Sequence, residues 1–182
     1  MIPLNIYCDG ACSGNQNKTN VGGWGAILEY GKHTKELFGG EKDTTNNRME
    51  LSALVYALSS VTRDGENICV FSDSAYLING MKNRWYETWQ KNGWKTANKM
   101  PVENRPLWEK ILSFLPSHTF SFYHVKGHVN PTGKQTNLAH HYERFCEKNG
   151  SSFSHEDFLH ITKMNNLADA LANKGIDQIR IR

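Results

Sequence analysis

The sequence predicts one α/β domain, spanning residues 1–182, in which helices flank a five-stranded mixed sheet. Strand-like segments come first, with apolar residues at every second position. The apolar spacing then changes to that of a helix, and helical and strand-like segments alternate from there on. A strand, a helix and a further strand imply a parallel crossover, so the sheet combines antiparallel and parallel pairs. A chain of 182 residues is long enough to bury the core of such a domain.

The first three elements are expected to be strands. Residues Leu4–Asp9 alternate between two faces until Gly10 interrupts the pattern. Residues Trp24–Tyr30 and Thr34–Gly39 flank a short glycine-containing turn, which is typical of a hairpin. The first strand is expected to lie beside this hairpin.

Helical and strand-like segments follow in alternation. Apolar residues recur at helical spacing from Asn47 to Val61, and the short apolar run Ile68–Phe71 predicts a buried strand. The remaining elements are expected to be a helix at Pro106–Leu115, a strand at Thr119–Val125, and a short helix at Asn166–Lys174 that Gly175 closes.

The composition excludes several classes of protein. Hydrophobic residues make up 38% and charged residues 21%, which is typical of a folded globular domain rather than of a disordered chain. No apolar run reaches the length of a membrane span, and the N-terminus lacks a signal sequence. We therefore expect a cytoplasmic protein with no membrane partner and, by default, a monomer with no obligate protein partner. The net charge of +3 suits an anionic partner without requiring one.

The four cysteines are unevenly spaced, and we expect them to be reduced thiols. A zinc site formed by Cys8 and Cys12 with His140 and His141 is an alternative. It is disfavoured because the chain lacks the paired spacing of zinc-binding motifs.

Three acidic residues are expected to converge. Asp9 and Asp73 each follow a strand, and the two strands are expected to be parallel neighbours, so both acids come to the edge where α/β sheets bind ligands. Glu50 falls in the apolar stripe of the first helix, where no Lys or Arg accompanies it. Buried carboxylates that face one another need a cation, and Mg²⁺ prefers oxygen ligands together with substrate phosphates. The pattern therefore indicates phosphoryl chemistry.

Asp169 is a fourth candidate carboxylate, in the first turn of the expected last helix. An alternative interpretation is that it stabilises that turn, because the helix dipole favours acidic residues there.

Seven short motifs occur along the chain, at Asp9–Asn15, Gly22–Leu28, Thr44–Leu51, Ser72–Ser74, Gly93–Thr96, Val125–His128 and Asn166–Ala172. Each motif is weak alone, but in this order they resemble the type 1 ribonucleases H. The resemblance covers about residues 4–128 and 165–175, and it implies a ribonuclease H-like fold.

The resemblance also implies a mechanism. Asp9, Glu50, Asp73 and Asp169 would hold two Mg²⁺ ions, with Mn²⁺ as a substitute, and would cleave the RNA strand of an RNA/DNA hybrid. The products would carry 5′-phosphate and 3′-hydroxyl ends. His128 matches a family residue that shuttles protons or helps the product to leave, although a loop histidine can also be a plain surface residue.

Substrate contacts are implied at two further groups of residues. Asn15, Asn46 and Asn47 match minor-groove residues, whose amides can bond a 2′-hydroxyl, although Asn46 and Asn47 could instead cap a helix. Thr45 and Asn104 match positions that bind a DNA phosphate. Asp43 stands two positions before this threonine, where relatives carry a basic residue, so the phosphate pocket would need Lys42 as a substitute.

The segment Lys82–Lys99 is expected to bind nucleic acid and occupies the place of the family's basic protrusion. Its five basic residues outnumber one acidic residue, and tryptophans are interleaved with them. The candidate contacts are Lys82, Trp85, Trp89, Trp94, Lys95 and Lys99. An alternative interpretation is that the segment is a solvated helix whose tryptophans reach into the core.

Residues 131–164 are expected to be a helical insertion, because the family has a much shorter connection before Asp169. Leu138–Lys148 and Phe153–Lys163 are expected to form a helical hairpin, whose second helix starts with the capping residues Ser154–Asp157. The insertion could be a lid, a second hybrid-binding surface or a passive elaboration.

The sequence thus predicts an endonuclease that hydrolyses the RNA strand of RNA/DNA hybrids. One alternative is a DNA-processing, integrase-like nuclease of the same superfamily. The other is a non-catalytic nucleic-acid binding module, which would have no physical reason to keep mutually repelling carboxylates.

Overall fold

The computed structural model describes residues 1–14 and 19–182. Within them, five strands form one sheet in the order β3-β2-β1-β4-β5. The strands are β1 (Leu4–Ser13), β2 (Val21–Tyr30), β3 (His33–Lys42), β4 (Asn67–Ser72) and β5 (Thr119–His124). The pairs β3-β2 and β2-β1 are antiparallel, whereas β1-β4 and β4-β5 are parallel. The predicted five-stranded mixed sheet is confirmed.

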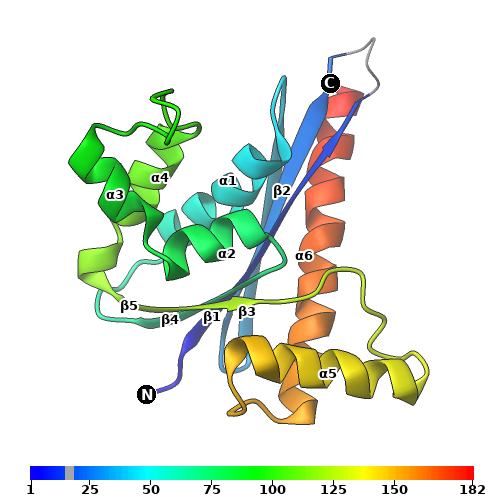
Figure 1. The fold of residues 1–182 in the computed structure, drawn as a ribbon. Helices are drawn as coiled ribbons and strands as arrows, with labels where there is room; N and C mark the ends of the chain where they lie inside the picture. Colours follow the sequence, from blue (N-terminus) through cyan, green and yellow to red (C-terminus); the bar gives the residue numbers. More distant parts are fainter. Residues whose placement is uncertain (15–18) are drawn as a thin grey trace.

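The helices of the described residues lie on both faces of the sheet (Figure 1). They are α1 (Asn46–Ser59), α2 (Ala75–Lys82), α3 (Trp85–Asn92), α4 (Arg105–Leu112), α5 (Gln135–Asn149) and α6 (His155–Ile181), with a 3-10 turn at Leu115–Ser117. Helices α1 to α4 gather on one face, and α6 runs along the other (Figure 1). In the described part of the chain, no helix combines the length and the apolar character of a membrane span.

The core has two parts, one on each face of the sheet. Neighbouring residues of β1 contribute to opposite parts, as the alternation of a strand requires. Ile6 is fully buried with Leu54 and Trp108 on the side of α1 and α4. Tyr7 is buried with Phe158 on the side of α6. Because the sheet is covered on both faces, its central strands hold the residues that follow them in fixed positions.

The first strand is longer than expected, and Gly10 does not end it. β1 continues to Ser13 because it pairs with β2 up to Ser13–Val21. Gly10 instead allows α1 to pack directly on the strand, since a Cβ atom at this position would lie 2.4 Å from the backbone nitrogen of Glu50.

The last helix also differs from the prediction. The helix expected at Asn166–Lys174 and the second helix of the expected hairpin are one continuous helix, α6, of 27 residues. It starts at the expected capping box, in which Ser154 and Asp157 bond each other's backbone N–H groups. Gly175 does not close the helix. A Cβ atom there would lie 2.0 Å from the carbonyl oxygen of Gly39 on β3, so the glycine permits close packing of α6 on the sheet.

Candidate active site

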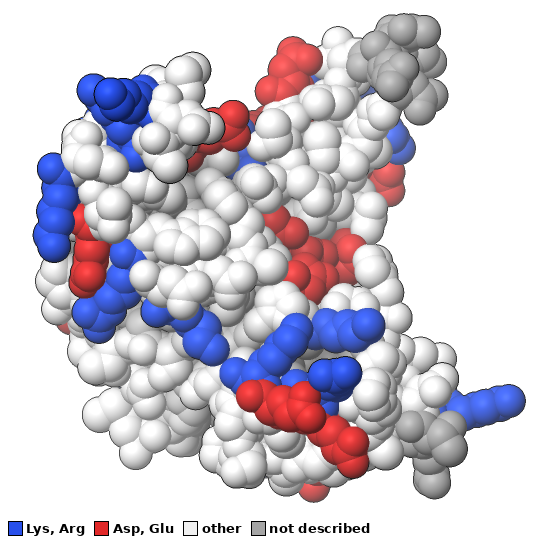
Figure 2. Space-filling view, in the orientation of Figure 1, with Lys and Arg blue, Asp and Glu red and all other residues white. Residues whose placement is uncertain are grey.

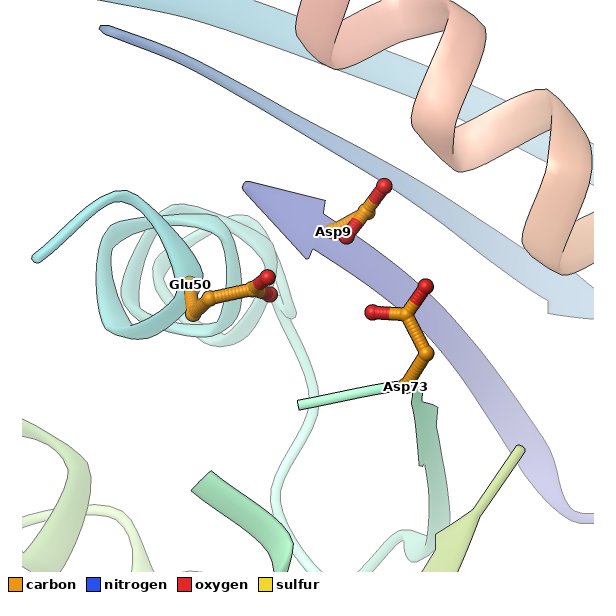
Figure 3. A group of neighbouring side chains, drawn as sticks. All are labelled: Asp9, Glu50 and Asp73. Atoms are coloured by element: carbon orange, nitrogen blue, oxygen red, sulfur yellow. The ribbon is translucent and has the colours of Figure 1, made fainter. Parts of the chain in front are cut away.

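Three carboxylates from separate elements meet near the centre of the sheet, where β4 ends beside β1. Asp9 lies on β1, Glu50 on α1 and Asp73 directly after β4, and Figure 3 shows their carboxylates turned toward one another. One oxygen of each lies within 4.8 Å of the corresponding oxygens of the other two. The structure therefore brings together three of the acids that the sequence singles out.

The sheet register explains why Asp9 and Asp73 meet. Tyr7 pairs with Phe71 in the parallel ladder between β1 and β4. Asp9 and Asp73 each come two residues later, so they extend from equivalent positions toward the same face. Glu50 joins them because α1 packs against β1 at Gly10.

The electrostatics of this cluster are unfavourable without a cation. Asp9 and Glu50 are buried, with 3% and 6% of their surface exposed. Burial, followed by the charges of Glu50 and Asp73, raises the pKa of Asp9 to about 11. Burial and then the charge of Asp73 raise the pKa of Glu50 well above its usual value. No ion pair found within residues 1–14 and 19–182 gives any of these acids a Lys or Arg partner.

One oxygen in the cluster lacks any partner in the structure. Glu50 Oε2 is buried and makes no hydrogen bond. A buried carboxylate oxygen without a donor is costly, and a bound cation would remove that cost. Three carboxylates that supply only oxygen ligands fit a hard divalent cation such as Mg²⁺ better than zinc, which takes mainly nitrogen and sulfur ligands.

Asp169 lies beside the cluster but outside its compact group of three. It is half-buried in the middle of α6, so the alternative of a residue that stabilises the first helical turn is wrong. The β1–β2 ladder pairs Asp9 with Gly25, and a Cβ atom on Gly25 would lie 2.5 Å from the carbonyl oxygen of Ala168. This close approach places Asp169 next to Asp9, where its carboxyl contributes to the raised pKa of Asp9.

His128 lies in the loop that follows β5, next to the acids. The loop starts beside the end of β4, because the N–H group of Val125 donates to the carbonyl of Ser72. A Cβ atom on Gly127 would lie 2.5 Å from Asp73 Oδ2, so this loop passes directly over the carboxylate. His128 is exposed and has a φ of 59°, in the left-handed region.

Two residues that the sequence analysis did not assign to the site support it. Asn166 donates from Nδ2 to the carbonyl of Val129 at 2.8 Å, which ties the His128 loop to the helix that carries Asp169. His124 Nε2 lies 3.1 Å from the carbonyl oxygen of Asp73. Asn166 is part of a recognised motif, so its position could have suggested this role. His124 carries no sequence signal beyond its place at a strand end.

The expected minor-groove residues lie at the start of α1. Thr45 caps the helix by accepting a hydrogen bond from the N–H group of Arg48 at 3.1 Å. The alternative that Asn46 and Asn47 cap the helix is therefore wrong, and both residues are exposed in the first turn. Asn15 lies outside the described residues.

The expected phosphate-binding residues precede two different helices. Thr45 precedes α1, whereas Asn104 precedes α4 and donates from Nδ2 to Tyr76 Oη at 3.5 Å. Asp43, which replaces the basic residue of relatives, follows β3 with a φ of 53°. The adjacent Lys42 ends β3 and is exposed, so its side chain is accessible to a phosphate.

The tryptophans of the Lys82–Lys99 segment pack toward the core, whereas its lysines are exposed. Trp94 is only 8% exposed and packs on Trp89. Its contact with a substrate stays a prediction. Trp89 also packs against Trp108 of the core, and Trp85 is half-buried beside it. The basic residues Lys82, Lys95 and Lys99 are all exposed. The tryptophans thus hold the segment on the core, while its lysines face solvent.

The cysteines give no support to a zinc site. All four are free thiols, and Cys8 is completely buried. Within the described residues, Asp9, Glu50 and Asp73 form the one group of three His, Cys, Asp or Glu side chains whose ligand atoms converge.

Comparisons with known proteins match this chain to one family. The family model described as RNase H matches residues 3–141. A protein named ribonuclease H from Clostridium botulinum (strain Hall) is 50% identical over 123 residues, which are 68% of this chain and 82% of the relative. Another, from Acetivibrio thermocellus, is 52% identical over 128 residues, which are 70% of this chain and 84% of the relative.

Solved structures share the fold. LC9-RNase H1, described as a type 1 RNase H with the type 2 active-site motif, aligns with a TM-score of 0.68 and 24% identity over 97% of this chain and 73% of its own. The PFV RNase H domain aligns with a TM-score of 0.59 and 24% identity over 96% of this chain and 94% of its own.

Proposed function

This chain belongs to the ribonuclease H family and is a ribonuclease H enzyme, and from this premise we propose that it hydrolyses the RNA strand of RNA/DNA hybrids with two bound Mg²⁺ ions. The observation that carries the proposal is the convergence of two buried carboxyl groups, Asp9 and Glu50, with the half-buried Asp73, which is costly unless the group binds cations. The hydrolysis adds water across a phosphodiester bond and leaves 5′-phosphate and 3′-hydroxyl ends.

The acids would act together as the metal-binding group. Asp9, Glu50 and Asp73 would bind the ions from the sheet and α1, and Asp169 would add a fourth carboxylate from α6. Ions held by these four residues would supply an activated water molecule and charge stabilisation at the leaving oxygen. Because β1, β4, α1 and α6 are all packed in the core, the carboxylates need little reorganisation when substrate binds.

His128 would move protons at the edge of the site. Its imidazole is exposed on the loop that crosses Asp73, so it can exchange a proton with solvent. Asn166 would keep that loop in place through its bond to Val129.

The exposed residues around the acids would bind the two strands. Asn46 and Asn47 are free to bond 2′-hydroxyl groups and base edges, which distinguishes RNA from DNA. Lys82, Lys95 and Lys99 would neutralise phosphates of the hybrid, and Thr45 and Asn104 would bind a phosphate of the DNA strand. We also assign residues 1–182 to a single domain that contains a helical insertion at 131–164.

A comparison of four substrates tests the proposed activity. The wild-type protein is incubated with end-labelled RNA/DNA hybrid, single-stranded RNA, duplex RNA and duplex DNA of one sequence, each with Mg²⁺ or with EDTA. We expect cleavage of the RNA strand of the hybrid alone, in Mg²⁺ alone, with 5′-phosphate ends that can be ligated. Cleavage of duplex DNA would instead support an integrase-like nuclease. Binding of the hybrid without cleavage would support a binding module.

A further inference from the structure

The inserted helix α5 forms one wall of a cavity beside the acids. The cavity has a volume of about 510 Å³, and Asp73 and the loop residues Lys126 and Gly127 line it on the side of the sheet. Residues of α5, among them Arg144 and Lys148, line the opposite side. The insertion is therefore part of the surroundings of the active site and is not remote from it.

The charges that line this cavity are almost all of one sign. Lys126, Arg144 and Lys148 contribute basic groups, and the only acid in the lining is Asp73 of the site itself. Arg144 and Lys148 are four residues apart, so they lie on one face of α5. Glu143 and Glu147 do not line the cavity. Glu147 Oε2 lies 3.3 Å from Arg144 Nη1, in an exposed ion pair that a phosphate would replace. Figure 2 shows Lys and Arg side chains directly beside the acidic patch.

The basic face of α5 is continuous with the basic segment after α2. A second hollow of about 340 Å³ is lined by Lys82 and Asn83 on one side and by His124 and Lys148 on the other. His124 and Lys148 also line the first cavity. The two hollows therefore adjoin at His124 and Lys148, and together they extend from the start of the Lys82–Lys99 segment to Asp73.

The C-terminal end of α5 is fixed to the sheet. Asn149 accepts a hydrogen bond from the backbone N–H group of His124 and donates one to its carbonyl, at 3.0 and 2.8 Å. Lys148 Nζ lies 3.3 Å from Nδ1 of the same histidine, whose Nε2 bonds the carbonyl of Asp73. These contacts hold Lys148 and the end of α5 in place before any ligand binds, which lowers the entropic cost of binding.

We propose that the basic face of α5 binds backbone phosphates of the RNA/DNA hybrid next to the cleavage site, through Arg144 and Lys148 together with Lys126. The inference rests on the proposed function, because it takes the hybrid as the ligand. The insertion then extends the binding surface that begins at Lys82, so that the hybrid is held on both sides of the acids. Phosphate contacts of this kind position the duplex without reading its sequence.

The salt dependence of binding tests this role. The affinity for an RNA/DNA hybrid is measured in EDTA, so that no cleavage occurs, at a series of KCl concentrations. The double variant Arg144→Ala, Lys148→Ala should reduce the slope of log affinity against log salt by about 2, and Arg144→Ala alone by about 1. The single variant leaves the Lys148–His124 contact intact, so it separates lost phosphate binding from a displaced helix.

A matched control removes the same charge elsewhere. Arg63 precedes β4 and Lys110 lies near the end of α4, so both are at the opposite end of the parallel strands from Asp73 and His124. The double variant Arg63→Ala, Lys110→Ala should keep the wild-type slope. If wild-type protein cuts the hybrid but the α5 variants also keep its slope, then the insertion does not bind phosphates. A wild-type protein that binds but does not cut the hybrid would overturn the proposed function and leave this inference standing.

Discussion

Replacement of Asp9 by Asn should abolish cleavage and at the same time stabilise the metal-free protein. The variant removes one of three carboxylates that converge within 4.8 Å, so it should lower kcat by about 10³-fold or more. The raised pKa keeps Asp9 protonated at pH 8 in the folded protein but not in the unfolded chain, which costs stability. Asn removes this cost, so the free energy of unfolding in EDTA should rise by about 1–2 kcal/mol at pH 8. Cleavage assays and urea titrations measure the two effects.

The pH dependence of the stability follows from the pKa of Asp9. Folding raises this pKa to about 11, whereas an unfolded Asp titrates at about 4. The folded metal-free protein therefore binds more protons than the unfolded chain between these values, and its stability falls as the pH rises. The gain from Asp9→Asn should accordingly be smallest near pH 4 and grow toward pH 8.

An exposed acid provides the control for this variant. Asp64 lies in the turn before β4 and is exposed, so Asp64→Asn should change neither cleavage nor stability appreciably. Activity close to that of the wild type would show that Asp9 is not catalytic, and a loss of stability would show that its burial does not destabilise the metal-free protein.

Gly175→Ala should destabilise the protein, although alanine is the better helix former. In an open helix this change would stabilise by about 1 kcal/mol. In α6 the added Cβ atom would lie 2.0 Å from the carbonyl oxygen of Gly39, and neither backbone can move without disturbing the packing of helix on sheet. We expect a net loss of about 2–3 kcal/mol in the free energy of unfolding. Cleavage should fall as well, because α6 carries Asp169.

The control for Gly175→Ala lies on the same helix. Asn173 is exposed, so Asn173→Ala should leave stability unchanged or raise it by a few tenths of a kcal/mol. A urea titration in which Gly175→Ala is as stable as this control would contradict the claim that close packing on β3 positions α6.

The positions of Asp9, Glu50 and Asp73 could be predicted from the sequence because local patterns determine them. Alternation fixes the face of a strand residue, the parallel crossover fixes which strand ends meet, and helical spacing fixes the face of Glu50. None of these arguments needs a distance between remote segments.

The length of α6 and the environment of Trp94 could not be predicted in this way. A glycine after a helical pattern usually indicates a helix end, and Gly175 fits this pattern. Glycine is needed there because α6 contacts β3, which lies far away in the chain. Trp94 looks like a binding residue among lysines, but its burial depends on Trp89 and Trp108. The link from Lys148 through His124 to Asp73 likewise joins three distant segments.

The binding of Mg²⁺ to the acidic group tests the central claim most directly. The thermal midpoint of unfolding is measured for the wild type and for Asp73→Asn, each in EDTA and in millimolar Mg²⁺, alongside hybrid cleavage under the same conditions. Ligand that binds only the folded state raises the midpoint, so the wild type should gain stability with Mg²⁺ and cut the hybrid, and Asp73→Asn should do neither. An equal rise in both proteins, or cleavage by the wild type in EDTA, would contradict the assignment of these carboxylates as the metal-binding catalytic group.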